Sequence, residues 1–175
     1  MGHATPLTTP AVLGIVGYSG AGKTTLIESI LPYLVVAGLQ IATLKHTHHT
    51  IPLDIPGKDS WRHKQAGAVM SMLLTTSQLQ IIQDVVPQIS PENLIPTYCA
   101  GMDLVLIEGF THMACAKIEV WRDGSAKSLR CADDSGLIAI ASDTAHDMDE
   151  LPVLSLNDGA GVAQFILHWL ASDDR

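Results

Sequence analysis

Aromatic residues are scarce in this sequence, and long apolar runs are missing. The 175 residues include three Trp, three Tyr and two Phe, so the core is expected to be mostly aliphatic. No apolar run approaches the ~20 residues that a membrane-spanning helix needs, and we therefore expect no membrane partner. Internal repeats and low-complexity tracts are also missing. With 47% hydrophobic and 16% charged residues, the sequence is typical of an ordinary globular protein.

Basic residues are also few. Lysine and arginine together number 10 against 18 acidic residues, which gives a formal net charge of −8. A nucleic acid that binds through its phosphates requires a basic face, so we expect no nucleic-acid partner. The charge does not exclude a free nucleotide, because one phosphate-binding loop is sufficient for this in an acidic protein.

Only three cysteines occur, and none belongs to a CxxC pair. The odd set of Cys99, Cys115 and Cys131 is most simply interpreted as reduced thiols of a cytoplasmic protein. Residues 1–10 lack the basic and apolar segments of a secretory signal peptide. With two prolines, they are expected to form a loose arm. The length suits one domain with a real core, which we expect to span residues 11–175.

One stretch of the sequence indicates a binding chemistry more clearly than any other. Residues 17–25, G-Y-S-G-A-G-K-T-T, match the phosphate-binding loop (P-loop, or Walker A motif) GxxxxGK[ST] in full. The apolar run 12–16 predicts a short buried strand before it, and residues 26–37 predict a helix after it. This is the setting that the motif requires. An accidental glycine-rich turn would need three glycines, a lysine and a threonine to coincide behind a strand.

Each residue type in the loop has a chemical reason. Glycines allow a tight turn that presents successive N–H groups to phosphate oxygens, and the start of the following helix adds partial positive charge. Lys23 is expected to reach the β- and γ-phosphates, and the Thr24 hydroxyl to ligate Mg²⁺. The expected contacts of a nucleoside triphosphate, or of a similar phosphorylated ligand, are Gly17, Tyr18, Ser19, Gly20, Ala21, Gly22, Lys23, Thr24 and Thr25.

The rest of the chain alternates between strand and helix patterns. Strands are predicted at residues 41–45, 68–74, 79–83, 103–108, 117–122, 137–141 and 153–156, and further helices at 59–65, 91–95 and 159–170. Behind a P-loop, this order predicts a three-layer α/β P-loop NTPase fold with a mostly parallel central sheet. The turn at residues 75–78 predicts a hairpin, and hence some antiparallel additions.

Several turns and helix ends can also be predicted. The alternation of apolar and charged residues in 117–122 predicts a half-buried strand, which Asp123-Gly124 would turn back. Pro96 should limit its helix, because proline removes a backbone hydrogen bond. Asp59 or Ser60 should cap the helix that follows.

Two carboxylates flank the clearest buried strand, at residues 103–108. Ligands of a parallel sheet gather at the carboxyl ends of its strands, and Glu108 lies at that end. Asp103 begins the strand, about 16 Å away at ~3.3 Å per residue. Glu108 is therefore predicted to serve Mg²⁺, directly or through a water, whereas Asp103 is expected to cap or solvate the start of the strand.

A polar cluster ends the strand at residues 41–45. Its members, which would line a phosphate or substrate cleft, are Lys45, His46, His48 and His49. A transition-metal site is an alternative, because HxHH brings imidazoles together, and a solvated polar loop is another. Further on, Asp54 suits Mg²⁺ or the orientation of a water, and Lys58 lies in a helix start that suits another anion. Catalytic roles are thus predicted for Lys23, Glu108 and Asp54.

A base contact is predicted at Asp143, which follows the apolar strand 137–141. A carboxylate in this place can accept two N–H bonds from guanine, whereas adenine lacks the N1–H and N2–H₂ pattern. An ordinary turn aspartate is an equally good interpretation. Asn157-Asp158, after the last strand, is a competing candidate.

In order and spacing, the motifs resemble those of a known family. The segments are Y-S-G-A-G-K-T-T, K-H-T-H-H, D-I-P-G-K-D-S, K-Q-A-G-A, L-V-L-I-E-G-F and I-A-I-A-S-D. They resemble MobB, the family of molybdopterin-guanine dinucleotide biosynthesis adaptor proteins, over residues 12–169. K-H-T-H-H together with P-G-K-D-S is specific to this group. The resemblance implies a homodimeric P-loop protein that binds GTP with Mg²⁺ and hydrolyses it poorly.

The resemblance also implies partners and site residues. The protein would act beside a MobA-type guanylyltransferase, which joins GMP to molybdopterin to make the guanylated molybdenum cofactor. Residues 17–25 would hold the phosphates, and Glu108 would serve the metal. Residues 45–49 and 54–60 would face the nucleotide or the pterin.

Two other functions fit the residues. A small-molecule kinase using ATP also fits the length and the P-loop, but it needs an arginine-rich lid near the γ-phosphate. Only four arginines occur, at positions 62, 122, 130 and 175. The same shortage predicts slow GTP hydrolysis, because an arginine finger is worth roughly 10³–10⁵ in rate. The third interpretation is a non-hydrolysing module that delivers nucleotide or pterin to a partner.

Overall fold

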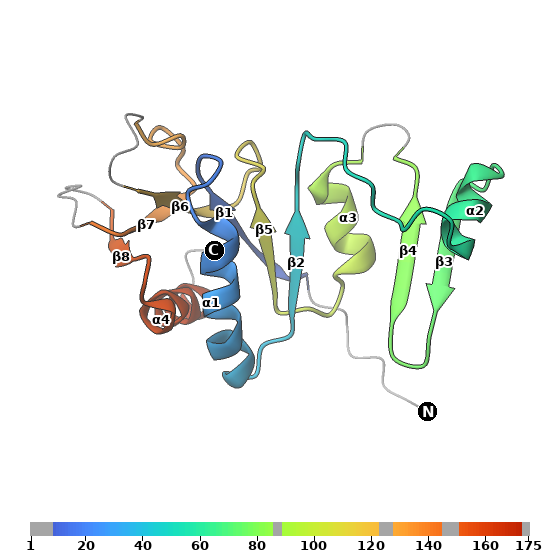
Figure 1. Cartoon of the computed structure of the whole chain (residues 1–175). Coiled ribbons are helices and arrows are strands. Elements are labelled where there is room, and N and C mark those ends of the chain that lie inside the picture. The colour runs from blue at the N-terminus through green and yellow to red at the C-terminus, as the bar shows by residue number, and fades with distance from the viewer. Residues whose placement is uncertain (1–8, 86–88, 123–127, 145–150, 173–175) are drawn as a thin grey trace, which may run out of the picture. The chain divides into compact units, whose positions relative to one another are not determined.

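The computed structural model describes residues 9–85, 89–122, 128–144 and 151–172 (Figure 1). Contacts divide the chain into two compact units, one formed by Met1–Thr47 with Pro91–Arg175 and the other by His48–Ser90. A single domain over residues 11–175 therefore stays a prediction. Most of the predicted arm and the predicted turn at residues 123 and 124 lie outside the described residues.

The first unit is built on a parallel sheet. Its six strands are ordered β2 (Ile41–Lys45), β5 (Leu104–Glu108), β1 (Ala11–Val16), β6 (Ala116–Trp121), β7 (Leu137–Ser142) and β8 (Val153–Ser155). Every neighbouring pair is parallel. Because β1 lies between β5 and β6, the carboxyl ends of these three strands meet at the edge of the sheet where the P-loop begins.

Helices cover both faces of this sheet. They are α1 (Lys23–Val36), α3 (Pro91–Tyr98) and α4 (Gly159–Ala171). α1 and α4 share one core cluster with Leu104 and Leu106, whereas α3 packs with Val105 and Ile107. Successive side chains of a strand point to opposite faces, so β5 must be apolar on both. The predicted three-layer α/β fold with a mostly parallel sheet is confirmed (Figure 1).

β6 is not the half-buried strand that its alternating sequence predicts. It pairs in parallel with β1 and β7, and its Lys117 and Glu119 are 1% and 0% exposed. Lys117 Nζ lies 2.8 Å from Asp134 Oδ2. Glu119 accepts the backbone N–H groups of Arg130 and Cys131 at 2.7 and 2.9 Å. Charges that are paired and hydrogen-bonded in this way tolerate burial. The alternation of charged and apolar residues in β6 therefore does not mark an exposed face.

Prolines lie inside two helices. α1 contains Pro32 and α3 contains Pro96, so the predicted end of the latter helix at residue 95 is wrong. Proline removes one backbone hydrogen bond, and burial of neighbouring side chains offsets the loss. Leu34 is 0% exposed and Ile95 4% exposed. None of the helices within the described ranges is long and apolar enough to cross a membrane.

The second unit contains a helix and a hairpin. Its elements are α2 (Asp59–Gln65), β3 (Met70–Leu74) and β4 (Leu79–Gln83). The predicted hairpin is confirmed, since β3 and β4 are antiparallel with Leu74 opposite Leu79. The turn between them is closed by Thr75, whose backbone N–H donates to the Gln78 carbonyl oxygen at 2.9 Å.

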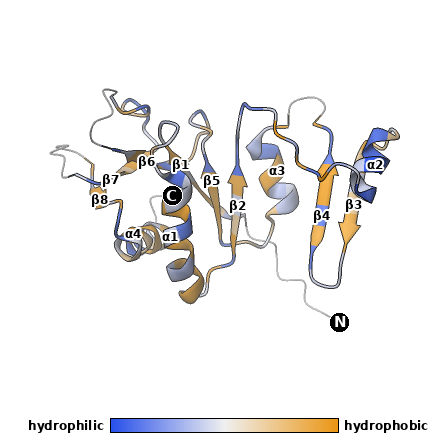
Figure 2. Cartoon of the chain, in the orientation of Figure 1, coloured by the Kyte–Doolittle hydropathy of each residue, from blue (hydrophilic) through white to orange (hydrophobic). Residues whose placement is uncertain are grey.

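Much of the apolar surface of the second unit is exposed. On the hairpin, Leu74 is 77% and Leu79 57% exposed, and Figure 2 shows apolar residues along both strands. α2 has no buried residue. It begins after Lys58, so Asp59 and Ser60 are helical residues and not the predicted caps.

Candidate functional site

The P-loop runs from the end of β1 into the first turn of α1. Its glycines at 17, 20 and 22 have positive φ angles of 134°, 78° and 105°, which residues with a Cβ rarely adopt. At Gly17, a Cβ would also overlap the carbonyl oxygen of Val120 on β6. Gly22 directly precedes α1, so the loop leads into a helix N-terminus, where anions are favoured.

Lys23 folds back over this loop. Its ammonium group donates to the carbonyl oxygens of Gly17 at 3.0 Å and Tyr18 at 2.7 Å. Burial lowers the pKa of Lys23 from its ordinary value; the negative charge of Glu108 opposes this effect, and nearby positive charges add to it. An anionic ligand would stabilise a cation that is partly removed from water in this way.

Glu108 connects three elements at the carboxyl edge of the sheet. Its Oε1 accepts a hydrogen bond from Thr24 Oγ1 of α1 at 2.9 Å and lies 3.0 Å from Lys45 Nζ at the end of β2. The register explains the meeting, because Glu108 lies opposite Lys45 on one side and Ile15 of β1 on the other. The structure thus brings the predicted residues Thr24, Lys45 and Glu108 together.

The groups at this edge fit a magnesium ion. Mg²⁺ prefers oxygen ligands and retains several waters in protein sites. The Thr24 hydroxyl and the Glu108 carboxylate supply two oxygens that lie 2.9 Å apart. Asp103 lies at the opposite end of β5, where its Oδ2 accepts the N–H of Gln40 at 2.7 Å. This contact fits the capping role that the sequence predicts for Asp103.

His46 contributes to the same edge through its backbone and its ring. Its N–H donates to the Glu108 carbonyl oxygen at 3.1 Å, and its ring meets Phe110 edge-on with centroids 4.7 Å apart. Sequence reasoning missed Phe110, although its place two residues after Glu108 was a signal. The residues that the structure describes include no group of three or more His, Cys, Asp or Glu side chains that could hold a metal ion.

The other predicted residues of this polar segment belong to the second unit. They are His48, His49, Asp54 and Lys58. Asp54 Oδ1 accepts hydrogen bonds from the Ile55 N–H at 2.8 Å and the Ser60 hydroxyl at 3.1 Å, which ties the loop to the start of α2. The roles of these four residues at the phosphate site stay predictions.

Two arginines contact the P-loop, and sequence reasoning placed neither of them there. Arg122 Nε donates to the Ala21 carbonyl oxygen at 2.9 Å. The guanidinium carbon of Arg130 lies 5.4 Å from the centre of the Tyr18 ring, within the range of a cation–π contact. The signal for Arg122 was its position at the end of a strand. The parallel pairing of β6 with β1 brings that end beside the P-loop.

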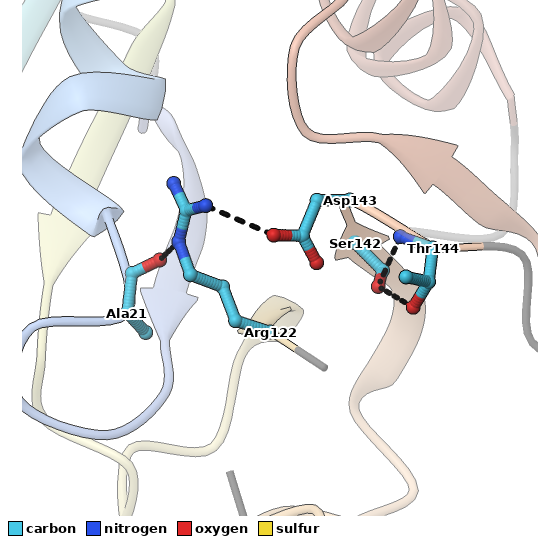
Figure 3. A network of polar contacts seen from close by, with 5 residues as sticks. All are labelled: Ala21, Arg122, Ser142, Asp143 and Thr144. Carbon is cyan, nitrogen blue, oxygen red and sulfur yellow. Dashed lines mark hydrogen bonds and ion pairs between the residues drawn. The ribbon is translucent and has the colours of Figure 1, made fainter. Parts of the chain in front are cut away.

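Asp143 follows β7 and forms an ion pair with Arg122 (Figure 3). Its Oδ2 lies 2.9 Å from Arg122 Nη1, and its side chain is 27% exposed. The turn after β7 is shaped by the Ser142 hydroxyl, which accepts the N–H of Thr144 at 3.2 Å. In the competing pair Asn157-Asp158, Asp158 accepts a backbone N–H in the first turn of α4 at 2.9 Å and caps that helix. The base-contact roles of Asp143 and of Asn157-Asp158 stay predictions.

Two pockets are lined by residues that belong to the P-loop or contact it. The smaller, of about 140 Å³, is lined by Tyr18, Ser19, Gly20, Ala21, Val120, Trp121 and Arg122. The larger, of about 500 Å³, is lined by Thr111, His112, Arg130, Cys131, Asp133, Asp134 and Ser135. Arg130 of the larger pocket contacts the ring of Tyr18, which lines the smaller one.

Solved structures of similar sequence have the same fold. The chain is similar to a crystal structure of molybdopterin-guanine biosynthesis protein B at 26% identity, with a TM-score of 0.76 over 92% of this chain and 99% of that one. It is also similar to the crystal structure of Bacillus subtilis MobB at 25% identity, with a TM-score of 0.73 over 90% and 96% of the two chains.

Curated relatives extend the likeness over the same length. The Escherichia coli (strain K12) molybdopterin-guanine dinucleotide biosynthesis adapter protein is 33% identical over 166 residues, which cover 91% of this chain and 93% of the relative. The adapter protein of Haemophilus influenzae is 35% identical over 160 residues, with 91% and 89% covered. The model of the MobB family, molybdopterin guanine dinucleotide synthesis protein B, matches residues 12–143. The resemblance inferred from the motifs is confirmed, and the chain belongs to the MobB family.

Proposed function

We propose that this chain is a GTP-binding accessory protein of molybdopterin guanine dinucleotide formation and assists a MobA-type guanylyltransferase. The observation that carries the proposal is the meeting of Lys23, Thr24 and Glu108 at the P-loop. Its relatives from Escherichia coli and Haemophilus influenzae are named adapter proteins of molybdopterin-guanine dinucleotide biosynthesis. The proposal extends that adapter role to this chain.

The phosphates of GTP would be held by the backbone N–H groups of the loop and by Lys23. The lysine donates to two loop carbonyl oxygens, and a phosphate oxygen offers it a full negative charge instead. Because burial lowers the pKa of Lys23, a bound polyanion would raise that pKa again. Triphosphate binding is therefore coupled to the protonated form of this side chain.

Thr24 and Glu108 are the residues that would hold Mg²⁺. When bound, the ion neutralises charge on the β- and γ-phosphates. Lys45 fixes the Glu108 carboxylate from the side of β2, with 3.0 Å between Nζ and Oε1. The carboxylate therefore has a defined orientation toward the first turn of α1.

Guanine would be recognised by Asp143 at the end of β7. A carboxylate has two acceptor oxygens, which match the paired N1–H and N2–H₂ donors of guanine. Adenine presents no such pair of donors on this edge. Asp143 is linked to the P-loop through Arg122, so the base contact and the phosphate contacts belong to one connected set of residues.

Hydrolysis of GTP is proposed to be slow. An arginine that reaches the transferred phosphoryl group is worth roughly 10³–10⁵ in rate. Arg122 is bound to the Ala21 carbonyl oxygen and to Asp143, and Arg130 packs on the Tyr18 ring. Both arginines near the loop therefore have other contacts.

We further propose that the chain functions as a homodimer and contacts molybdopterin. The exposed apolar side chains of the β3–β4 hairpin support a contact with a second copy. The segments at residues 45–49 and 54–60 are the proposed contacts of the pterin or the nucleotide. In the first of them, Lys45 and His46 lie beside Glu108.

A reconstituted guanylation assay tests the proposal. A MobA-type guanylyltransferase, molybdopterin and GTP would be combined with and without this chain, and the formation of the dinucleotide would be followed. The wild type should stimulate the reaction and K23A should not. E28Q, which changes an exposed charge on the same helix, is the matched control. No stimulation by the wild type would refute the accessory role.

A further inference from the structure

Arg122 bridges two parts of the site that are far apart in sequence (Figure 3). Its Nε donates to the carbonyl oxygen of Ala21 in the P-loop at 2.9 Å. Its Nη1 donates to Asp143 Oδ2, also at 2.9 Å. One guanidinium group therefore holds a backbone atom of the phosphate loop and the predicted base-contact carboxylate at the same time.

The bridge depends on the shape of arginine. A guanidinium group is planar and carries its N–H donors in fixed directions, so two partners bound to it are held at a set distance and angle. A lysine ammonium group is a single point on a flexible stem and cannot replace both contacts at once. The loop also leaves room for the group, because a Cβ at Gly22 would lie 3.1 Å from Arg122 Nη2.

We propose that Arg122 is a positioning residue for guanine selectivity, which fixes the Asp143 carboxylate relative to the phosphate loop. This inference rests on the proposed function, in which Asp143 accepts the N–H groups of guanine. The ion pair does not prevent that contact, because each carboxylate oxygen can accept two hydrogen bonds. Without Arg122, the carboxylate has lost the bond that ties it to the P-loop, and its preference for guanine weakens.

Calorimetric titration with Mg·GTP and Mg·ATP tests the inference. We expect R122A and R122K each to lower the ratio of GTP affinity to ATP affinity by about tenfold, the worth of one charge-assisted hydrogen bond. E28Q changes an exposed charge on α1 and should leave the ratio unchanged. An unchanged ratio in R122A, or tighter GTP binding by it, would overturn the inference.

A double-mutant cycle with D143A distinguishes positioning from a general effect on the loop. If Arg122 acts through Asp143, R122A lowers the GTP to ATP ratio in the wild-type background but not in the D143A background. Additive losses would show that Arg122 acts on its own, and the inference would fail. A wild type that does not prefer GTP would instead refute the proposed guanine site. R122K retains the positive charge and keeps the test valid if R122A does not fold.

Discussion

Thr24 and Glu108 are 84 positions apart in the sequence, yet their side chains share a hydrogen bond of 2.9 Å. The contact exists because β5 is the direct neighbour of β1, so that the end of β5 lies beside the first turn of α1. A cation that binds the Thr24 hydroxyl therefore meets a carboxylate. In the proposed function, the Mg²⁺ dependence of nucleotide binding would therefore rest largely on Glu108.

E108Q should lose most of that dependence. Glutamine keeps the size of the side chain but removes its charge, so we predict about tenfold weaker GTP binding in Mg²⁺ and little change in EDTA. Calorimetric titration in the two buffers measures the difference, with E28Q as the control. An equal loss in both buffers would mean that Glu108 supports the loop and not the ion.

The same variant separates an accessory GTPase from a delivery module. GTP hydrolysis by E108Q is expected to fall below that of the wild type, because the developing charge on the phosphates is less well neutralised. Stimulation of the guanylyltransferase is measured beside it. If stimulation survives the loss of hydrolysis, the protein acts by binding and delivery. If both are lost together at a GTP concentration that saturates E108Q, hydrolysis belongs to the function.

Lys23 should make the folding stability of the ligand-free protein depend on pH in a defined direction. Its pKa is lowered, chiefly by burial, so protonation costs the folded state more than the unfolded one. This cost is fully present below the lowered pKa. It disappears as the pH rises from that value to 10.5, where the unfolded lysine also loses its proton.

K23A removes this cost, but it also removes the two hydrogen bonds from the ammonium group to the loop. The stability of the free wild type relative to K23A should therefore rise as the pH increases from neutral toward 10.5. Thermal unfolding followed by circular dichroism across this range shows the trend. Because other groups titrate equally in both proteins, the test uses only the difference between their unfolding temperatures at each pH. A wild type whose stability relative to K23A stays constant or falls over this range would contradict the lowered pKa of Lys23.

Lys117 and Glu119 of β6 show that the burial of a strand cannot always be predicted from its sequence pattern. Lys117 and Glu119 alternate with apolar residues, which is the pattern of a strand with one wet face. Their partners are Asp134 and the backbone of residues 130 and 131, and no local pattern in β6 specifies a pairing with that distant segment. The central strand β5 was predictable because all its inward positions are aliphatic.

Removing the two members of the Lys117–Asp134 pair should have unequal effects. D134N leaves a lysine that is 1% exposed without its counter-charge, and we predict a loss of about 3 kcal/mol in the free energy of unfolding. K117M leaves a carboxylate that is 31% exposed and can be hydrated, so its loss should be smaller. Urea unfolding at pH 7 compares the variants. Equal losses would contradict the asymmetry.

The same pair contributes to acid unfolding. The hydrogen bond from Lys117, helped by the Gly136 N–H, holds the pKa of Asp134 below its ordinary value of 3.8. Stability from this pair is therefore present above pH 3.8 and is lost as the pH falls through the lowered pKa. The stability advantage of the wild type over D134N should shrink in that window. An advantage that persists unchanged would show that the pairing is not electrostatic.

Some residues of the P-loop site could be predicted from the sequence, and others could not. The motif itself specified Lys23 and Thr24, and the rule that ligands gather at strand ends specified Glu108. Arg122 obeys the same rule, but it was missed because the sequence does not show that β6 is the neighbour of β1. Arg130 lies on a loop between strands, and only tertiary packing brings it to the Tyr18 ring.

If the homodimer forms through the β3–β4 hairpin, one charge added to that surface should weaken it. Leu74 is 77% exposed and lies opposite Leu79, so L74E leaves the fold of a single chain intact while it makes an apolar contact unfavourable. We predict a shift from dimer to monomer in size-exclusion chromatography with light scattering. Q80E, an exposed change on β4, is the control. A dimer that survives L74E would place the interface elsewhere.

Calorimetric titration of the wild-type protein with Mg·GTP and Mg·ATP tests the central claim most directly. The connected set of Lys23, Glu108, Arg122 and Asp143 predicts that GTP binds at least about tenfold more tightly than ATP, since guanine alone can fill both oxygens of one carboxylate. Equal affinities would contradict the account, and a preference for ATP would also favour a kinase that uses the same loop.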